Sequence, residues 1–451
     1  MDARARARLP LVVLGAAIVL GSLPRIDAVS RFYPPDRDQR TDARRYYISM
    51  AESALAGQGW IPSYPTNFIP PPGQAAFILV LKAAWPRSDF QHLRTVQALV
   101  SIATILLAYA LGRALHDRWT GALSALTTSL YYKHSEMVGV LLPETNHLFL
   151  LFAFVLAWGM ALQRRTLGWC AAAGALLALA CLFKPTPLLL APVLCATLWK
   201  RPDPRPAVVA LLCVIAVLAP WTIRNWRHYG GLYPISTNGG TLLALANAPA
   251  LDSARPEMTY WDDLYRLDYY KDAEIEARYA GLLDADGKPE ENLKDRAYAG
   301  RALRYMLAQP LHFLRNYAYK TWHFLVLPPP DEAGSGSFPF REVSWLRWLV
   351  LVAGLLGTGL LLARARWQPF ARASVMTLLY LLAMGALLHL TRDGRMNLAF
   401  RALLCAPASY ALVLAVQWLG RWGGQWRGRD QARRERANTV VASTSTATTA
   451  P

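Results

Sequence analysis

Cysteine is scarce in this 451-residue chain, and no cysteine lies in a long polar segment. A disulfide-stapled fold needs paired cysteines in its loops, so the sequence argues against that class of small extracellular domain. The cysteines are instead typical of small apolar residues within helices. They are Cys170, Cys181, Cys195, Cys213 and Cys405.

The chain also lacks a P-loop and a dinucleotide-binding fingerprint, so it offers no obvious site for a soluble nucleotide. No motif recurs with a period of about 20 to 50 residues, which argues against a repeat architecture. The two halves of the chain do not match each other, as the halves of many secondary transporters do.

Acidic residues are few: 30 Asp and Glu stand against 48 Lys and Arg, which gives a formal net charge of +18. Such an excess can indicate nucleic-acid binding, but here the basic residues lie before the first apolar run and in short connections between later ones, as at Arg164 and Arg165. This is the cytoplasmic excess of the positive-inside rule. No basic and aromatic platform for nucleic acid is present.

Long apolar runs are the dominant feature of the sequence, which is 54% hydrophobic. A helix needs about 20 mostly apolar residues to cross a bilayer, and with their flanks these runs reach that length. We therefore predict an all-α polytopic membrane protein with about ten transmembrane helices and both ends in the cytoplasm. The expected spans are 9–23, 95–113, 119–141, 145–163, 167–183, 186–199, 206–224, 344–363, 372–390 and 402–420.

The polar stretches between these runs divide the chain into regions. The short run after the basic start could be a cleaved signal peptide, but no small-residue cleavage site precedes Arg25, which favours an uncleaved first span. Pro70–Pro72 precede a helix that we expect to dip into the outer leaflet. The expected regions are a basic start and first span (1–24), a first outer loop with interfacial helices (25–93), a transmembrane bundle (94–224), an outer region with helices at 293–307 and 311–324 (225–342), three last spans (343–420) and a disordered cytoplasmic tail (421–451).

The stretch from Asp42 to Trp60 carries a carboxylate at its start. Tyr46, Met50 and Ala51 recur at helical spacing on one side, and charged residues such as Arg45 occupy the rest. Such a helix is expected to lie along the membrane surface and to present Asp42 there. The alternative role for Asp42 is that of a helix N-cap.

Three further groups of polar residues are expected on the outer side. Ionisable residues at membrane depth are often functional, whereas a carboxylate at a helix start and an arginine at a solvated helix end also have structural explanations. Outer basic residues oppose the topology rule and suit an anionic headgroup. The groups are His134, Glu136 and Glu144; Lys184, Arg224 and Arg227; and Arg395 with Arg401.

Metal-binding patterns are weaker. Asp36 and Asp38 form a D-x-D pair whose carboxylates could hold a divalent cation. A second such pair, at Asp284 and Asp286, is followed by glycine and is more typical of a turn. His134 has no evident third ligand nearby in the sequence. The sequence therefore predicts no firm metal site and leaves metal dependence open.

The order of motifs resembles that of the GT-C membrane glycosyltransferases of the protein mannosyltransferase and aminoarabinose transferase type, over about residues 9–420. The most specific motif is 220–225 (PWTIRN), which is followed by 234–240 (PISTNGG), with Asn238, and then by Ala246 and Asn247. The run Arg-Tyr-Arg-aliphatic-Pro, common in the last outer loop of that family, is missing around Arg395, and Lys184 replaces the usual arginine of the mid-chain hairpin. The other matching residues are Asp42, Tyr46, Ala51, Gly57, Gly59, Pro71, Pro72, Gly73, Glu144 and Pro185.

The resemblance implies an enzyme that moves a sugar from a polyprenyl-phosphate carrier to a hydroxyl of an envelope glycan such as lipopolysaccharide, a lipid or a protein, at the outer face of a bacterial inner membrane. Asp42 would be the base and Glu144 the second acid, with inversion at the anomeric carbon. Lys184, Arg224 and Arg395 would bind the donor phosphate. The expected pocket residues are Arg45, Tyr46, His134, Glu136, Arg227 and Asn238.

Two other classes of protein fit the composition. A lipid or solute transporter or flippase would also have about ten spans, but its charges are expected near the membrane midplane in broken helices. A non-catalytic scaffold would leave the interfacial acid and the outer arginines unexplained.

Overall fold

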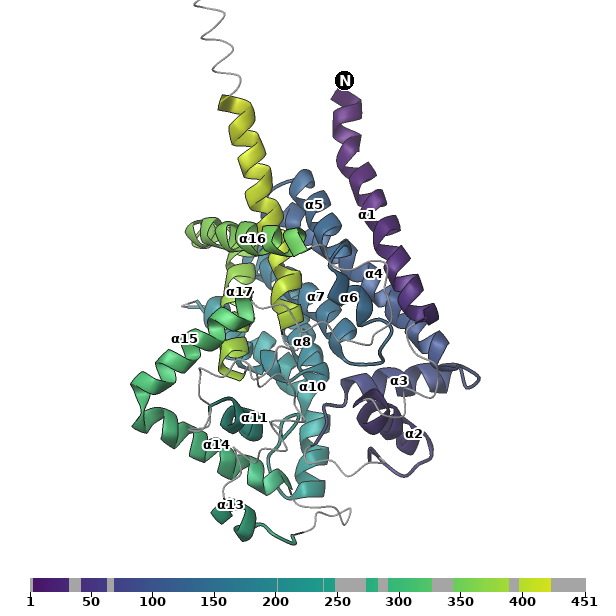
Figure 1. Cartoon of the computed structure of the whole chain (residues 1–451), viewed down its shortest axis with the longest axis vertical. Helices are drawn as coiled ribbons and strands as arrows, with labels where there is room; N and C mark the ends of the chain where they lie inside the picture. Colours follow the sequence, from purple (N-terminus) through teal and green to yellow (C-terminus); the bar gives the residue numbers. More distant parts are fainter. Residues whose placement is uncertain are drawn as a thin grey trace, which may run out of the picture.

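The computed structural model describes residues 3–31, 42–62, 69–200, 202–237, 239–247, 273–282, 291–326, 344–388 and 397–422. These parts of the chain are helical, with no β-strand among them (Figure 1). Seven helices are long and apolar enough to cross a membrane, and three apolar helices are shorter. The predicted all-α polytopic membrane protein is thereby confirmed. The seven are the apolar segments Arg8–Ser30, Phe90–Leu115, Glu144–Arg164, Arg205–Tyr229, Leu346–Arg364, Pro369–Leu388 and Asn397–Trp422.

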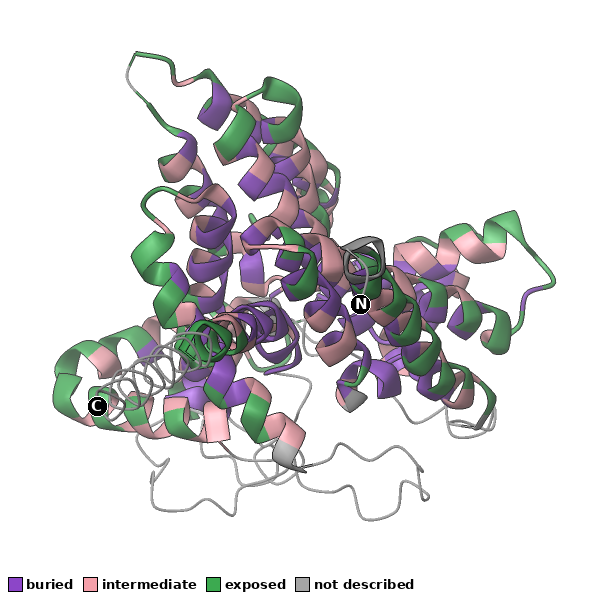
Figure 2. Ribbon diagram, turned by 90° about the horizontal axis from the view of Figure 1, so that it is seen from above, coloured by how far each residue is buried: buried purple, intermediate pink, exposed green. Residues whose placement is uncertain are grey.

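The central bundle consists of helices that are close together in the sequence. These helices pack tightly against one another through small residues. A Cβ on Gly112 of α4 (Phe90–Leu115) would lie 2.6 Å from the carbonyl oxygen of Thr120 in α5 (Arg118–Ser129). Gly174 of α8 (Leu167–Phe183) approaches Ala210 of α10 (Arg205–Tyr229) in the same way. Small residues at such crossings let helices approach in a bilayer. Buried residues accordingly concentrate in the middle of the molecule (Figure 2).

Helix α1 (Ala3–Arg31) extends beyond the predicted span 9–23. The prediction ended the helix before Arg25, which is instead fully buried. Its guanidinium donates to the Gly21 carbonyl at 2.6 Å and to Ser101 Oγ of α4 at 2.7 Å. Because these partners satisfy the charge's hydrogen bonds inside the protein, the helix continues past it.

The predicted span 119–141 is wrong as a single helix. Helix α5 ends at Ser129, Tyr131 has an extended conformation, and the short helix α6 (Tyr132–Glu136) follows. Thr127 and Ser129 donate their hydroxyls to carbonyls three and four residues earlier, a local pattern that competes with regular helix and favours its end. Residues 134–148 are nevertheless buried. We call 130–143 the re-entrant segment.

The first outer loop folds as predicted into short helices. A π-helical turn, η2 (Ala43–Ile48), runs into α2 (Ser49–Leu55), and the dipping helix is α3 (Gly73–Ala84). At 12 residues α3 is too short to span a bilayer. Met50 and Ala51 are buried, so the predicted apolar face of this stretch packs against the protein.

The hairpin at Lys184 also forms as predicted. Helix α7 (Glu144–Arg164) returns through α8, which ends at Phe183, and a turn of 3-10 helix, η3 (Thr186–Leu189), leads into α9 (Leu190–Leu198). The proline at 185 ends one helix and begins the next, as the sequence indicates.

The outer region contains α11 (Gly239–Ala246), α13 (Ala273–Arg278), α14 (Glu291–Ala308) and α15 (Pro310–Val326). The last two match the helices predicted at 293–307 and 311–324. They form a V at one side of the molecule, opposite α1 (Figure 1).

The last part of the chain consists of α16 (Ser344–Arg364), α17 (Pro369–Leu388) and a final helix, Asn397–Trp422. Helix α16 runs across the direction of α1 and of the final helix (Figure 1). It contacts the final helix through Gly357, where a Cβ would lie 1.9 Å from the Pro407 carbonyl oxygen. The start of α1 and the end of the final helix lie at the same end of the molecule (Figure 1).

Candidate active site

The first turn of α7 contains three polar residues that bind two different helices. Glu144 Oε1 lies 3.0 Å from Lys184 Nζ, just after α8. Asn146 Nδ2 donates to Gln74 Oε1 of α3 at 2.9 Å, and His147 Nδ1 lies 3.0 Å from the Ala180 carbonyl of α8. The start of α7 is thus joined to both α3 and α8. We call Gln74, Gln97, Glu144, Asn146, His147 and Lys184 the polar junction.

Gly73 explains why the proline motif precedes α3. A Cβ at this position would lie 2.8 Å from the carbonyl carbon of Leu182 and 2.7 Å from the Phe183 ring. Only glycine lets the start of α3 reach the end of α8, directly beside Lys184. The motif Pro71-Pro72-Gly73 therefore places Gln74 next to the Glu144–Lys184 ion pair.

Gln97 links the polar junction to the re-entrant segment. Its Nε2 donates to the carbonyls of Met137 at 3.0 Å and Val140 at 2.8 Å, and its Oε1 accepts from Gln74 at 3.1 Å. Non-helical backbone at membrane depth must find such partners inside the protein. Gln74 and Gln97 were not predicted as site residues, although a side-chain amide within an apolar run is a signal of a buried polar contact.

Replacing Gln97 by Leu is expected to destabilise the protein by about 3 kcal/mol or more, because it leaves buried backbone carbonyls without a donor. The measurement is thermal unfolding of the detergent-purified protein. The matched control is Gln91→Leu at an exposed position of the same helix, where the change is expected to be within about 0.5 kcal/mol. Equal behaviour of the two variants would contradict the role assigned to Gln97.

Asp42 lies half-buried at the start of η2, next to the partly buried Arg45 and Tyr46. Its carboxylate makes no capping hydrogen bond to the first turn, so the N-cap explanation considered from the sequence is excluded. On the same short helical stretch, Arg44 pairs with Glu52 at 2.9 Å. The catalytic role of Asp42 stays a prediction.

The motif 220–225 fastens the chain that follows α10. Trp221 Nε1 donates to the Ile235 carbonyl at 2.8 Å, and Asn225 Nδ2 donates to the Tyr233 carbonyl at 3.0 Å. The Nη2 of Arg224 donates to the Trp60 carbonyl at 3.1 Å, so this arginine joins α10 to the first outer loop shortly after α2. In this motif, Trp221 and Asn225 therefore hold the chain that follows α10, and Arg224 contacts the first outer loop.

His134 lies in a closed set of hydrogen bonds. Its Nδ1 is 3.0 Å from Arg25 Nη2 and its Nε2 is 3.0 Å from Ser101 Oγ, and the side chain is fully buried. Glu136 lies 2.9 Å from Lys133. These contacts hold the re-entrant segment against α1 and α4. Arg25 was missed because α1 was predicted to end before it.

The other predicted residues are distributed differently. Arg227 is exposed near the end of α10. Asn238 and Arg395 lie outside the described residues, as do Asp36 and Asp38, so their predicted roles stay predictions. Among the residues that the structure does describe, no group of three or more His, Cys, Asp or Glu side chains could hold a metal ion.

Two partly buried polar contacts connect helices of the outer region. Asp295 of α14 accepts from the backbone amides of Gly240 and Thr241 at the start of α11, and burial raises its pKa. Lys320 of α15 donates to Asn247 Oδ1 at 2.8 Å and to the Ala246 carbonyl at 2.9 Å. Burial lowers the pKa of Lys320 to about 7. The two ends of α11 are thus held by α14 and α15.

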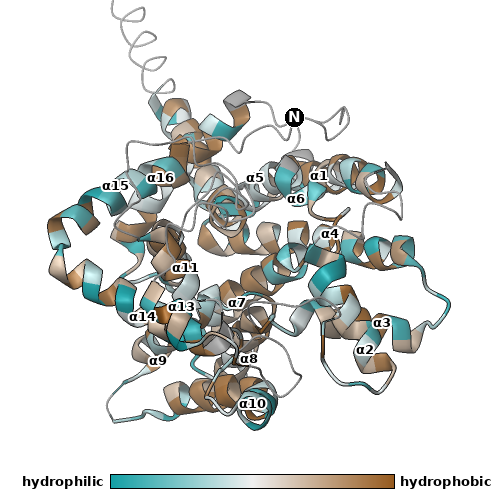
Figure 3. Ribbon diagram, turned by 60° about the horizontal axis from the view of Figure 1, so that its bottom comes forward, coloured by the Kyte–Doolittle hydropathy of each residue, from teal (hydrophilic) through white to brown (hydrophobic). Residues whose placement is uncertain are grey.

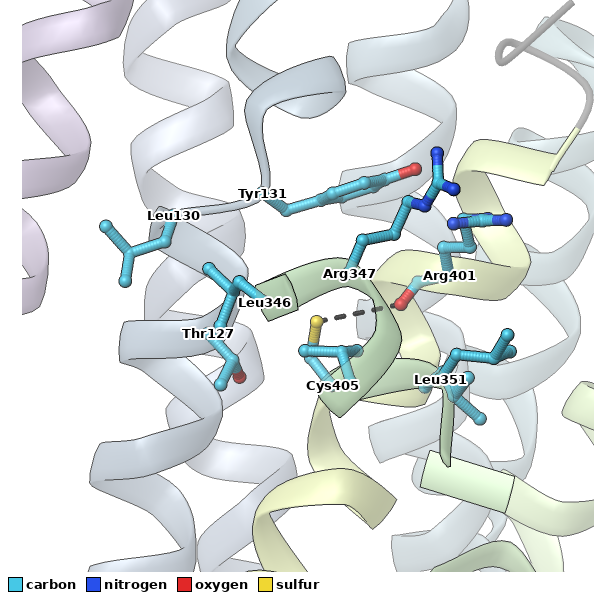
Figure 4. A pocket seen from close by; sticks show the side chains of 10 residues that line it. Thr127, Leu130, Tyr131, Leu346, Arg347, Leu351, Arg401 and Cys405 are labelled. Atoms are coloured by element: carbon cyan, nitrogen blue, oxygen red, sulfur yellow. Dashed lines mark hydrogen bonds between the residues drawn. The ribbon is translucent and has the colours of Figure 1, made fainter. Parts of the chain in front are cut away.

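A small cavity of about 20 Å³ lies between the end of α5, α16 and the final helix. Figure 4 shows Tyr131, Arg347 and Arg401 on one side of it and Cys405 and Thr127 on another. The buried Arg401 also donates to the Leu325 carbonyl at 2.9 Å. This cavity involves none of the polar junction residues.

The fold is that of the GT-C membrane glycosyltransferases, as the motif order suggested. The oligosaccharyltransferase AglB of Archaeoglobus fulgidus, in complex with an inhibitory peptide and a dolichol-phosphate, is 16% identical and aligns over 93% of this chain with a TM-score of 0.52. The same enzyme tethered with an acceptor peptide aligns over 93% at 15% identity and a TM-score of 0.53. The chain spans about half the length of AglB, 52% and 51% in these two structures.

Residues 71–223 match the family model of dolichyl-phosphate-mannose-protein mannosyltransferase. That segment begins at the proline motif and includes the whole polar junction. ArnT from Cupriavidus metallidurans, bound to undecaprenyl phosphate, aligns over 91% of this chain and 78% of its own at 16% identity, with a TM-score of 0.35. No curated protein matches the sequence.

Proposed function

We propose that the protein is a glycosyltransferase that moves a sugar from a polyprenyl-phosphate carrier to a hydroxyl acceptor at the outer face of a bacterial inner membrane. The observation that carries the proposal is the GT-C fold over 93% of the chain. The family match at 71–223 supports it, because it covers Glu144 and Lys184, which we assign to the acceptor and the donor phosphate. The dolichol-phosphate bound to AglB, which has a similar fold, suits a lipid-phosphate donor.

Transfer breaks the bond between the anomeric carbon and the carrier's phosphate oxygen and forms one to the acceptor oxygen. The leaving group is an already acidic lipid phosphate, so it needs cations rather than a general acid. Lys184, Arg224 and Arg395 are assigned to that phosphate. The ion pair between Glu144 and Lys184, at 3.0 Å, would hold the Lys184 ammonium in position for this contact.

The acceptor hydroxyl needs a base that takes its proton as the new bond forms. Asp42 is assigned this role because it lies on the outer loop, does not cap its helix and precedes the aromatic pocket residue Tyr46. Glu144 would orient the acceptor or share the proton. Attack opposite the phosphate in one displacement would invert the anomeric carbon.

The test uses purified protein, polyprenyl-phosphate sugars and a lipid extract from the source cells. Loss of sugar from the carrier, with release of polyprenyl phosphate, is the expected result, and a nucleotide sugar is expected to give none. Binding of the carrier with no loss of sugar, combined with its movement across vesicles, would contradict the proposal and identify a transporter.

A further inference from the structure

The hairpin of α14 and α15 carries a row of exposed apolar side chains. Leu307 and Leu311, on either side of the connection at Gln309, are 81% and 82% exposed. The row continues along α15 with Leu314 and Trp322, which are 56% and 62% exposed. Positions 311, 314, 318 and 322 share one side of a helix. Exposed apolar rows of this size are unusual in water.

The opposite side of the hairpin is packed on the protein. Tyr298 of α14 is buried against Leu245 of α11. Phe324 of α15 lies so close to Gly385 of α17 that a Cβ there would be 2.5 Å from its ring. The exposed row therefore faces away from the bundle, and the hairpin cannot bury it by closing on its own chain.

The position of α15 along the bundle identifies what covers this row. Tyr317 donates its hydroxyl to the Ala383 carbonyl at 3.1 Å, and Lys320 donates to the Leu387 carbonyl at 3.4 Å. Both acceptors belong to the apolar segment Pro369–Leu388, which is long enough to cross the membrane. In Figure 1, α15 lies beside α17, and the tip of the hairpin projects sideways from the bundle. Because the hairpin lies beside a segment that can cross the membrane, we infer that its tip contacts the bilayer.

Charge and aromatic content also match a lipid surface. From Arg296 to Val326 the sequence has five basic residues, no acidic residue and seven aromatic residues. Arg304 and Arg315 flank the exposed leucines, where their long side chains can reach headgroups. Hydrophobic and hydrophilic residues alternate around both helices at the edge of the molecule (Figure 3). This combination is typical of helices that lie in the membrane interface.

We propose that the α14–α15 hairpin is inserted into the outer leaflet, with Leu307, Leu311, Leu314 and Trp322 among the acyl chains. The hairpin was expected from the sequence to be part of an extramembrane region. Leaflet insertion makes it a membrane-bound wall beside α17. The proposal does not depend on the glycosyltransferase function.

The test places a nitroxide at Leu311→Cys and Leu314→Cys in proteoliposomes of phosphatidylethanolamine and phosphatidylglycerol. Leu282→Cys, exposed after α13 in the same outer region, is the matched control. Wild-type protein treated with the same label supplies the baseline for the native cysteines. Collision with oxygen, which concentrates in lipid, and with a water-soluble nickel chelate is measured by electron paramagnetic resonance.

The ratio of oxygen to nickel collisions is expected to be several-fold higher at both hairpin positions than at Leu282→Cys. An equal ratio at all three positions would overturn the proposal, because the row would then lie in water. Low collision rates with both reagents at 311 and 314 would also overturn it, because protein rather than lipid would then cover the row.

Discussion

Asparagine in place of Asp42 is expected to lower the rate of sugar transfer by about 10²- to 10⁴-fold, the range that a positioned general base contributes. Asn has nearly the same shape as Asp and removes only the negative charge and the basicity of the side chain. The fold and carrier binding are therefore expected to persist. The measurement is the single-turnover rate with carrier-linked sugar, together with the affinity for the carrier.

The matched control is Glu52→Gln, which also changes a carboxylate to an amide on the same helical stretch. Glu52 pairs with Arg44 at 2.9 Å, with both side chains 38% exposed. Such exposed pairs contribute about 0 to 1 kcal/mol, so this variant is expected to transfer sugar at nearly the wild-type rate. Equal rates for Asp42→Asn and Glu52→Gln would remove Asp42 from the chemistry.

Separating Glu144 from Lys184 is expected to have the second large effect. Their contact at 3.0 Å is mostly buried, with side-chain exposures of 5% and 24%. Removing one partner of a buried ion pair typically costs about 3 to 5 kcal/mol, because the other charge is left alone. Glu144→Gln and Lys184→Gln are therefore each expected to lose both stability and turnover.

The double variant Glu144→Gln/Lys184→Gln distinguishes a structural pair from a functional one. It leaves no lone charge, so thermal stability is expected to recover in large part, while turnover stays low because the phosphate has lost a cation. The pair Lys294 and Glu276, 2.8 Å apart in the outer region, supplies a matched double control that is expected to keep turnover. Recovery of turnover together with stability would show that the pair at Glu144 is structural.

Local patterns predicted much of the architecture. The apolar runs predicted the long helices correctly. A membrane helix satisfies its own backbone hydrogen bonds, so sufficient length and apolar side chains are enough to indicate one. The helices α14 and α15 and the hairpin at Lys184 follow from helical spacing and from prolines close in sequence. The prediction of one span at 119–141 was wrong because local bonds of Thr127 and Ser129 favour a helix end, and because the chain beyond it is satisfied by Gln97, 40 residues before Met137.

The polar contacts depend on positions that no local pattern connects. Arg25 meets His134 across 109 residues, and Arg224 meets Trp60 across 164. Glu144 and Lys184 were both singled out from the sequence, but their direct pairing required the packing of α7 on α8. The sequence could therefore point to charged residues at membrane depth, whereas their partners required the three-dimensional arrangement.

In the proposed reaction, an acceptor hydroxyl that is deprotonated by Asp42 displaces the lipid phosphate in one step. The most direct test is the anomeric configuration of the transferred sugar, determined by nuclear magnetic resonance with a carrier of known configuration and wild-type protein. Inversion is the predicted result. Retention would contradict the proposed reaction, because it requires a second displacement through a covalent sugar intermediate on the protein.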